Sequence, residues 1–331
     1  MGLLIEGVWY DQWYDTKSHG GRFVRQSSPF RDWVTADGSS GFPAEAGRYH
    51  LYVSYACPWA HRALILRKLK GLEKVISVDP VHWFMGENGW QFDADHPDTV
   101  NGARYLHENY VRAKPDYTGR VTVPTLWDRQ TGTIVNNESA DLVRILNGEF
   151  NTFARYPERD FRPADLRDEI EAVNERVYHT VNNGVYKAGF ATAQAAYEEA
   201  VDALFDSLDW LEDRLSRQRY VAGDRLTEAD IRLFTTLLRF DPVYVGHFKC
   251  NKYRIADYPN LWNYTRDLYQ LPGVAETVRM DHIKNHYYQS HPKVNPTGIV
   301  PKGPIVDFDA PHDRNRFGGP GGLDAVAARA A

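Results

Sequence analysis

One cysteine of this chain stands where a nucleophile would be expected. Residues 55–62 read Tyr-Ala-Cys-Pro-Trp-Ala-His-Arg, with Cys57 directly before Pro58. Proline is favoured at the first position of a helix, so Cys57 faces unpaired backbone N–H groups and the positive end of the helix dipole. Both favour a thiolate over a thiol, and His61 and Arg62, one turn away, add positive charge.

The other cysteine does not pair with the first in an obvious redox motif. Position 60 is alanine, so no Cys-x-x-Cys motif is present, and Cys250 lies far away in sequence. We interpret Cys250 as an inert thiol. A lone reactive thiolate forms mixed disulfides that an external thiol resolves, so we expect monothiol chemistry at Cys57.

The elements around Cys57 follow the order of a thioredoxin-like domain. Residues 49–54 are aromatic and β-branched, which predicts a buried strand, and residues 58–70 are strong helix formers. The pattern continues with a strand at 75–78, a helix around 99–112, a strand pair at 123–127 and 133–135 joined by the turn 128–132, and a helix at 139–146.

Beyond residue 148 the strand patterns stop. Apolar residues recur at helical spacing, which predicts helices at 164–186, 194–217, 227–240, 259–269 and 272–284. The third of these begins with a capping-box pattern, in which Thr227 and Asp230 satisfy each other's backbone. The expected fold is therefore α/β plus all-α. The expected divisions are an irregular extension at 1–47, a thioredoxin-like domain at 48–150, a helical domain at 164–291 and a tail at 292–331.

Composition excludes several classes of protein. The chain has 331 residues and a net charge of −5, which disfavours generic nucleic-acid binding. Two distant cysteines make no disulfide framework and favour a reducing compartment, so we expect a cytoplasmic location. No export signal, membrane span, zinc-ligand spacing or nucleotide-binding glycine motif is recognised, so we expect no metal, nucleotide or membrane partner.

Several segments together resemble the glutathione-transferase superfamily, and more narrowly the glutathionyl-hydroquinone reductases of the Xi class. The similarity runs from roughly residue 20 to residue 300. It is carried by the residue runs 57–60 (Cys-Pro-Trp-Ala), 89–90 (Gly-Trp), 119–124 (Gly-Arg-Val-Thr-Val-Pro), 137–139 (Asn-Glu-Ser), 183–191 (Asn-Gly-Val-Tyr-Lys-Ala-Gly-Phe-Ala) and 286–291 (His-Tyr-Tyr-Gln-Ser-His).

The resemblance implies a glutathione site in the first domain. A cis peptide bond at Val123–Pro124 exposes the Val123 backbone to the cysteinyl part of glutathione. Glu138 and Ser139, at a helix start, meet the γ-glutamyl ammonium and carboxylate groups. The implied glutathione-binding residues are Trp90, Arg120, Val123, Pro124, Glu138 and Ser139. The alternatives are a strand with an edge proline at 123–124, simple helix capping at 138–139 and a solvated charge at Arg120.

The resemblance also implies a polar-edged aromatic pocket for a hydroquinone. Its expected residues are Tyr186, Tyr287, Tyr288 and His291, of which Tyr186 or Tyr288 would supply a proton. Each tyrosine is also compatible with simple packing, and His291 with a helix end.

The implied function is reduction of S-glutathionyl-hydroquinones, with glutathione as co-substrate and Cys57 as nucleophile. We also expect a homodimer. Three alternatives stay open at this point: a thioltransferase of the omega or glutaredoxin kind, a non-enzymatic binding protein, and the same chemistry with a different low-molecular-weight thiol.

Overall fold

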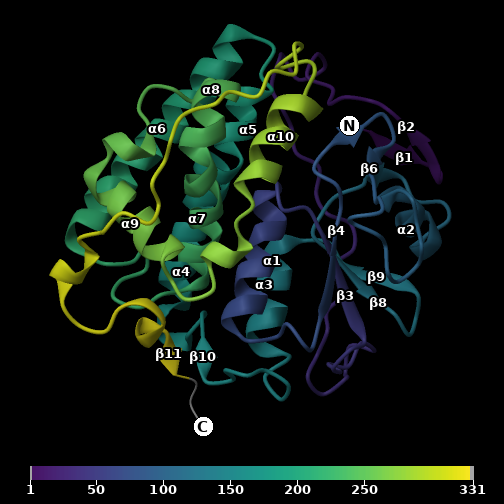
Figure 1. Ribbon diagram of the computed structural model, residues 1–331, viewed down its shortest axis with the longest axis horizontal. Helices are drawn as coiled ribbons and strands as arrows, with labels where there is room; N and C mark the ends of the chain where they lie inside the picture. Colours follow the sequence, from purple (N-terminus) through teal and green to yellow (C-terminus); the bar gives the residue numbers. More distant parts are fainter. Residues whose placement is uncertain (1, 329–331) are drawn as a thin grey trace. The chain divides into compact units, whose positions relative to one another are not determined.

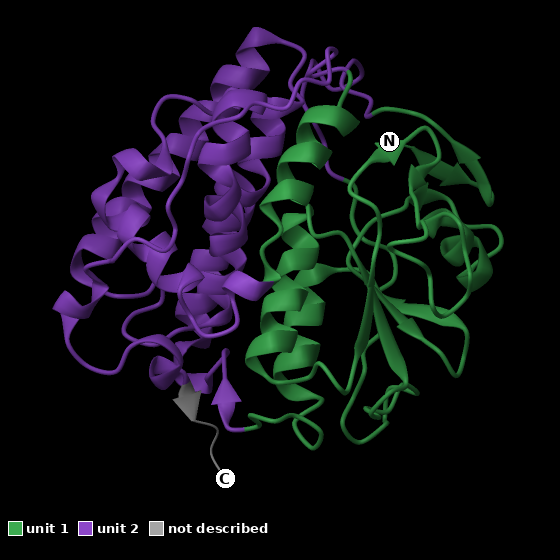
Figure 2. Cartoon of the chain, viewed as in Figure 1, with its two compact units in different colours: residues 1–13, 26–157, 277–292 green, residues 14–25, 158–276, 293–331 purple. Residues whose placement is uncertain are grey.

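The chain folds into two compact units in the computed structural model, which describes residues 2–328 (Figure 2). Unit 1 comprises residues 1–13, 26–157 and 277–292, and unit 2 comprises residues 14–25, 158–276 and 293–331. Each unit therefore gathers segments that are distant in sequence. The sequence-based division at residues 47, 150 and 291 follows the chain, and that division stays a prediction.

Unit 1 contains a four-stranded mixed sheet (Figure 1). Its strands are β3 (Tyr49–Val53), β4 (Ser77–Pro80), β8 (Thr125–Asp128) and β9 (Thr133–Asn136), in the order β4-β3-β8-β9. Strand β3 pairs parallel with β4 and antiparallel with β8, and β8 pairs antiparallel with β9. Helices α1 (Pro58–Leu69) and α3 (Ser139–Gly148) contact each other, and α2 (Leu106–Ala113) contacts β9. The predicted thioredoxin-like arrangement is confirmed.

The N-terminal extension is more ordered than its composition indicates. Strands β1 (Leu3–Ile5) and β2 (Val8–Tyr10) form a hairpin, and β1 also pairs with β7 (Gly119–Arg120). The two-residue turn holds Glu6 and Gly7 at φ of 50° and 77°. Two positive φ values define the turn that suits a hairpin, but Glu-Gly is not among the usual signals for it. The hairpin at residues 3–10 was not expected within the predicted irregular extension.

Two predicted helices begin later than expected. Helix α2 begins at Leu106, because the Asp98 carboxylate accepts hydrogen bonds from the backbone N–H groups of Val100, Asn101 and Ala103 and holds this stretch as a loop. The helix expected at 272–284 is α10 (Met280–Ser290), which belongs to unit 1. Unit 1 also contains a small hairpin of β5 (Met85–Gly86) and β6 (Gly89–Trp90).

Unit 2 is mainly helical, as expected. Its principal elements are α4 (Arg167–Val177), α5 (Gly184–Gly189), α6 (Gln194–Arg217), α7 (Glu228–Arg239), α8 (Val245–His247) and α9 (Pro259–Tyr269). The segment predicted as one helix at 164–186 is divided into a 3₁₀ turn η1 (Ala164–Leu166), α4, a π-helical turn η2 (Tyr178–Asn182) and α5. A second π-helical turn, η3 (Phe240–Tyr244), follows α7. The predicted capping box at Thr227 and Asp230 is present.

The C-terminal residues of unit 2 are mostly irregular. They contain the 3₁₀ turns η6 (Arg314–Phe317) and η7 (Gly322–Ala325), and a short strand β11 (Ala327–Ala328) that pairs with β10 (Arg159–Asp160). Two further 3₁₀ turns, η4 (Ile255–Asp257) and η5 (Ala275–Thr277), occur earlier in the chain. Among residues 2–328, no helix is both long and apolar enough to cross a membrane.

Candidate active site

Cys57 is the N-cap residue of α1 in unit 1. Its backbone is extended, and Pro58 begins the helix, as the sequence predicts. The residue is half-buried, and its Sγ donates a hydrogen bond to the Val123 carbonyl oxygen at 3.5 Å. The loop before the helix is fixed by a hydrogen bond from the Cys57 backbone N–H to the Ser54 carbonyl at 3.1 Å. The thiol therefore lies at a helix N-terminus, beside residues 121–124. These residues lead into β8 and are called the Val123 loop below.

The loop beside Cys57 contains the expected cis peptide bond at Val123–Pro124. The hydroxyl of Tyr110, a fully buried side chain on α2, donates to the Thr122 carbonyl at 2.8 Å and accepts from the Thr122 N–H at 3.2 Å. The Asn137 side chain donates to the same hydroxyl at 3.1 Å. Tyr110 thus joins the Val123 loop to the start of α3. This role of Tyr110 was not predicted, because an aromatic residue on a predicted helix carries no signal of it.

Glu138 and Ser139 lie at the start of α3, where both were expected. Glu138 is the N-cap and accepts from the Ala140 N–H at 3.1 Å, so the capping role is present. Its second carboxylate oxygen accepts from the Ser28 hydroxyl at 3.1 Å. Ser139 is buried, and its Oγ accepts from an Arg62 guanidinium nitrogen at 3.3 Å. Binding of glutathione at these two residues stays a prediction.

Arg62 was expected only as a positive charge near the thiol, and its contact with Ser139 was not predicted. Its side chain, on α1, is 1 % exposed, and its guanidinium lies 4.5 Å from the centre of the Trp59 ring. Through the bond to Ser139 it connects the helix that follows Cys57 with the helix that follows Glu138. The sequence shows a basic residue one turn after the thiol, but nothing local indicates its partner.

Trp90 and Arg120, two other residues expected to contact glutathione, make contacts within unit 1. Trp90, on β6, is buried and stacks on His286 with ring centres 4.8 Å apart. The Arg120 guanidinium donates to the carbonyl oxygens of Gly2, Gln12 and Trp13 at 3.2, 2.6 and 3.1 Å. Arg120 therefore holds the two ends of the N-terminal hairpin in place. Glutathione contacts at Trp90 and at Arg120 stay predictions.

The expected hydroquinone residues fall in both units. Tyr287 and Tyr288 are buried on α10, and His291 is the C-cap of that helix. The His291 ring meets Tyr287 edge to face, with ring centres 5.5 Å apart. These three residues belong to unit 1.

Tyr186 belongs to unit 2, on α5. Its ring packs among aromatic neighbours within that unit, and the Arg25 guanidinium lies 5.6 Å from its centre. The aromatic neighbours are Phe190, Tyr244 and Phe248. Roles for Tyr186 and the α10 residues in binding or proton transfer stay predictions.

The second cysteine is part of the core of unit 2. Cys250 is fully buried, and burial raises the pKa of its thiol well above the usual range. Its interpretation as an inert thiol is consistent with this environment. No cluster of three or more metal-ligating side chains occurs in the part of the chain that the structure describes.

Two family models match the chain. Residues 56–149 match the N-terminal domain of glutathione S-transferase, and residues 194–267 match its C-terminal domain. The first match contains Cys57, the Val123 loop and the start of α3, and the second contains helices α6 and α7 and most of α9. The fold and the surroundings of Cys57 thus define a glutathione-transferase-like protein.

Similar proteins narrow the class. Glutathionyl-hydroquinone reductase PcpF of Sphingobium chlorophenolicum is 59 % identical, covering 92 % of this chain and 96 % of that protein. Glutathionyl-hydroquinone reductase YqjG of Escherichia coli is 57 % identical, covering 96 % of this chain and 100 % of that protein. The glutathione-bound structure of YqjG matches with a TM-score of 0.88 at 53 % identity, over 96 % of this chain and 100 % of that one.

This chain belongs to the glutathione S-transferase family and, within it, to the glutathionyl-hydroquinone reductases of the Xi class. The family and the fold class expected from the sequence are both confirmed.

Proposed function

We propose that this protein reduces S-glutathionyl-hydroquinones to hydroquinones through a mixed disulfide between Cys57 and glutathione. The observation that carries the proposal is the position of Cys57. It is a half-buried thiol at the N-terminus of α1, with its Sγ 3.5 Å from the backbone of the Val123 loop. A helix N-terminus stabilises a thiolate, and the loop backbone offers hydrogen bonds to a bound tripeptide.

In the first step the Cys57 thiolate attacks the sulfur of the glutathionyl group. A sulfur–sulfur bond forms, and the bond between sulfur and the aromatic carbon breaks. The electron pair of the broken bond goes to the aromatic carbon, which must take up a proton because it leaves poorly as an anion. We assign that proton to a tyrosine hydroxyl, Tyr186 or Tyr288. The products are free hydroquinone and Cys57 joined to glutathione.

In the second step a second glutathione thiolate attacks the mixed disulfide. Its sulfur bonds to the sulfur of the first glutathione, and the electron pair returns to Cys57 as a thiolate. Glutathione is thereby oxidised to its disulfide, while the aromatic carbon has been reduced. A serine at position 57 could not form the sulfur–sulfur bond on which both steps depend.

The decisive experiment is intact-protein and peptide mass spectrometry after a single turnover with glutathionyl-menadiol, without free glutathione. We expect one glutathione on Cys57 and release of menadiol. Cys57→Ser should lose the adduct and lower kcat/KM by roughly three orders of magnitude or more. Cys250→Ala is the matched control, because it removes the other thiol and should keep both adduct and activity.

Two results would contradict the mechanism: an aryl adduct on Cys57, or full turnover by Cys57→Ser. Comparing rates on glutathionyl-menadiol and on hydroxyethyl disulfide separates this reaction from a general thioltransferase. Replacing glutathione with other low-molecular-weight thiols tests which thiol the protein uses.

We further propose that the protein is a cytoplasmic homodimer. Cell fractionation tests the location, and analytical sedimentation tests the dimer.

A further inference from the structure

Trp9, on strand β2 of the N-terminal hairpin, contacts the short β5–β6 hairpin that carries Trp90. The Trp9 side chain is partly exposed, and its indole Nε1 donates a hydrogen bond to the Glu87 carbonyl oxygen at 2.8 Å. Glu87 lies in the turn between β5 and β6. The hydrogen bond therefore reaches this hairpin three residues before Trp90, the residue expected to contact glutathione.

The Trp9 ring also packs against Gly89, the residue directly before Trp90. A Cβ atom at Gly89 would lie 2.7 and 2.8 Å from the Cη2 and Cζ2 atoms of the Trp9 ring, which is closer than side-chain carbons come. Gly89 has a φ of 75°, a conformation that favours glycine. The ring thus lies directly on the backbone that leads into Trp90, with no side chain between them.

A stack of rings fixes the orientation of Trp9. Its indole stacks on His107 with ring centres 4.8 Å apart, and His107 stacks on Tyr105 with ring centres 5.4 Å apart. Burial lowers the pKa of His107, so its imidazole is neutral at neutral pH. The Asn88 side chain donates to the Tyr105 hydroxyl at 3.4 Å. Glu87 and Asn88, the two turn residues between β5 and β6, are therefore both held by this stack.

Helix α10 holds the strands of the same hairpin. The Met85 N–H donates to Ser290 Oγ at 3.0 Å, and the Trp90 ring stacks on His286. His286 Nδ1 lies 2.8 Å from the Trp83 carbonyl oxygen, and since a carbonyl only accepts, this nitrogen carries the hydrogen. The hairpin is thus held at its strands by α10 and at its turn by the N-terminal hairpin.

We propose that Trp9 is a positioning residue for Trp90. Its hydrogen bond to Glu87 and its packing on Gly89 fix the turn, so that the Trp90 indole keeps one orientation toward bound glutathione. A side chain that is already held in its binding orientation loses less conformational freedom when the ligand binds. The proposal rests on the proposed function for the role of Trp90, and it gives the N-terminal hairpin a part in substrate binding.

The direct test is fluorine NMR of the full chain, with its nine tryptophans replaced by 5-fluorotryptophan. Loss of one resonance in Trp90→Phe identifies Trp90. Trp9→Phe keeps a ring beside Gly89 but removes the N–H donor, so we expect it to shift or broaden the Trp90 resonance. Trp33→Phe is the matched control, because Trp33 is also partly exposed in unit 1 and its indole donates to Glu149. It should leave the Trp90 resonance unchanged.

Steady-state kinetics connect the orientation of Trp90 with the reaction. Trp9→Phe should raise the KM for glutathionyl-menadiol roughly threefold and Trp9→Ala roughly tenfold, with less than about a twofold change in kcat. When Trp90→Phe is already present, Trp9→Phe should raise KM by no more than about 1.5-fold, because both substitutions act through the same indole. Thermal unfolding monitors stability, and Trp9→Phe carries the test if Trp9→Ala does not fold.

Two results would overturn the proposal: a Trp90 resonance that Trp9→Phe leaves unchanged, or an effect of Trp9→Phe on KM that is equally large with and without Trp90. Turnover by the parent protein tests the proposed function separately. If the parent does not turn over glutathionyl-menadiol while Trp9→Phe still shifts the Trp90 resonance, the reductase function is contradicted, and the dependence of Trp90 on Trp9 is supported.

Discussion

Arg62 is the residue that connects the two helix starts of the candidate site. Its guanidinium donates to Ser139 Oγ at 3.3 Å, and its side chain is buried beside Trp59. A guanidinium cannot lose its proton in a protein, so the hydroxyl oxygen of Ser139 acts as the acceptor and its hydrogen points elsewhere. If Ser139 binds the γ-glutamyl carboxylate, Arg62 orients that hydroxyl and adds positive charge near the bound anion.

We therefore expect Arg62→Met and Ser139→Ala each to raise the KM for glutathione roughly tenfold, with a smaller effect on kcat. In the double variant, the increase in KM should correspond to less free energy than the sum of the two single effects, because each substitution removes the same interaction between Arg62 and Ser139. Steady-state kinetics at varied glutathione concentration measures this, with thermal unfolding to monitor stability. Effects of the two substitutions that add independently would mean that Arg62 serves only the packing between α1 and α3.

The positions of single residues could be predicted where the pattern is local. Pro58 fixes the start of α1, so the place of Cys57 follows from adjacent residues. Arg62 and Ser139 are 77 residues apart, and Tyr110 and Asn137 are 27 apart. No local pattern pairs such residues, because only the folded sheet brings their helices together. Arg120 likewise resembled a solvated or ligand-binding charge, yet it donates to carbonyl oxygens on either side of the N-terminal hairpin, more than 100 residues away in sequence.

At the scale of elements, the β8–β9 hairpin depends on a buried ion pair. Asp128, at the end of β8, is fully buried and accepts from two Arg48 nitrogens at 2.9 and 2.7 Å. Burial alone would raise the pKa of this carboxyl, but hydrogen bonds from Arg48, Thr131 and the Gln130 N–H outweigh burial and lower the pKa below its ordinary value. A carboxyl whose pKa is lower in the folded state than in the unfolded state stabilises the fold at pH values above its unfolded-state pKa. This stabilisation is lost as the pH falls through its folded-state pKa.

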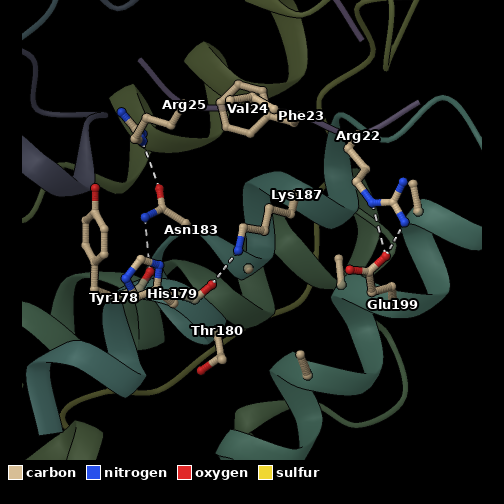
Figure 3. A pocket seen from close by; sticks show the side chains of 14 residues that line it. Arg22, Phe23, Val24, Arg25, Tyr178, His179, Thr180, Asn183, Lys187 and Glu199 are labelled. Carbon is tan, nitrogen blue, oxygen red and sulfur yellow. Dashed lines mark hydrogen bonds and ion pairs between the residues drawn. The ribbon is translucent and has the colours of Figure 1, made fainter. Parts of the chain in front are cut away.

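We expect Asp128→Asn to lower the free energy of unfolding by about 3 kcal/mol near neutral pH, because the buried Arg48 loses its buried counter-charge and keeps only the exposed Glu45 as an acidic partner. Urea titrations of the parent and the variant should show this difference shrink as the pH falls below about 4, because the Asp128 carboxyl of the unfolded parent chain is protonated there while that of the folded state is still ionised. Glu199→Gln, in an exposed pair with Arg22 (Figure 3), should change stability by less than about 1 kcal/mol. A difference that is the same at acid and neutral pH would contradict the assignment.

Most elements were predictable because they follow from periodicity and end signals. The order of strands and helices in unit 1 and the capping box of α7 are examples. The π-helical turn at 178–182 was not predictable, since the apolar spacing continues across it. The β1–β2 hairpin was missed because Glu-Gly is a rare turn pair and each strand has only three residues.

At the scale of the whole molecule, unit 2 is completed by residues from the end of the chain. Arg314 is fully buried and donates to the carbonyl oxygens of Leu215, Gln218 and Arg219, at 2.8, 2.6 and 2.7 Å. These carbonyls lie at and just beyond the end of α6, where helix carbonyls lack partners within the helix. The sequence showed a tail rich in proline and glycine, and partners 95 to 99 residues away could not be predicted from it.

We expect Arg314→Met to lower the free energy of unfolding by about 3 kcal/mol, because three carbonyls at the end of α6 lose a charged donor. Differential scanning calorimetry measures the loss, and limited proteolysis should cleave the variant first within the C-terminal tail. Arg316→Met is the matched control: it lies in the same turn but is partly exposed and pairs with Asp313, so it should cost less than about 1 kcal/mol. Equal losses of melting temperature in the two variants would mean that the tail stabilises unit 2 through general contact, and not through the donors that Arg314 supplies to the end of α6.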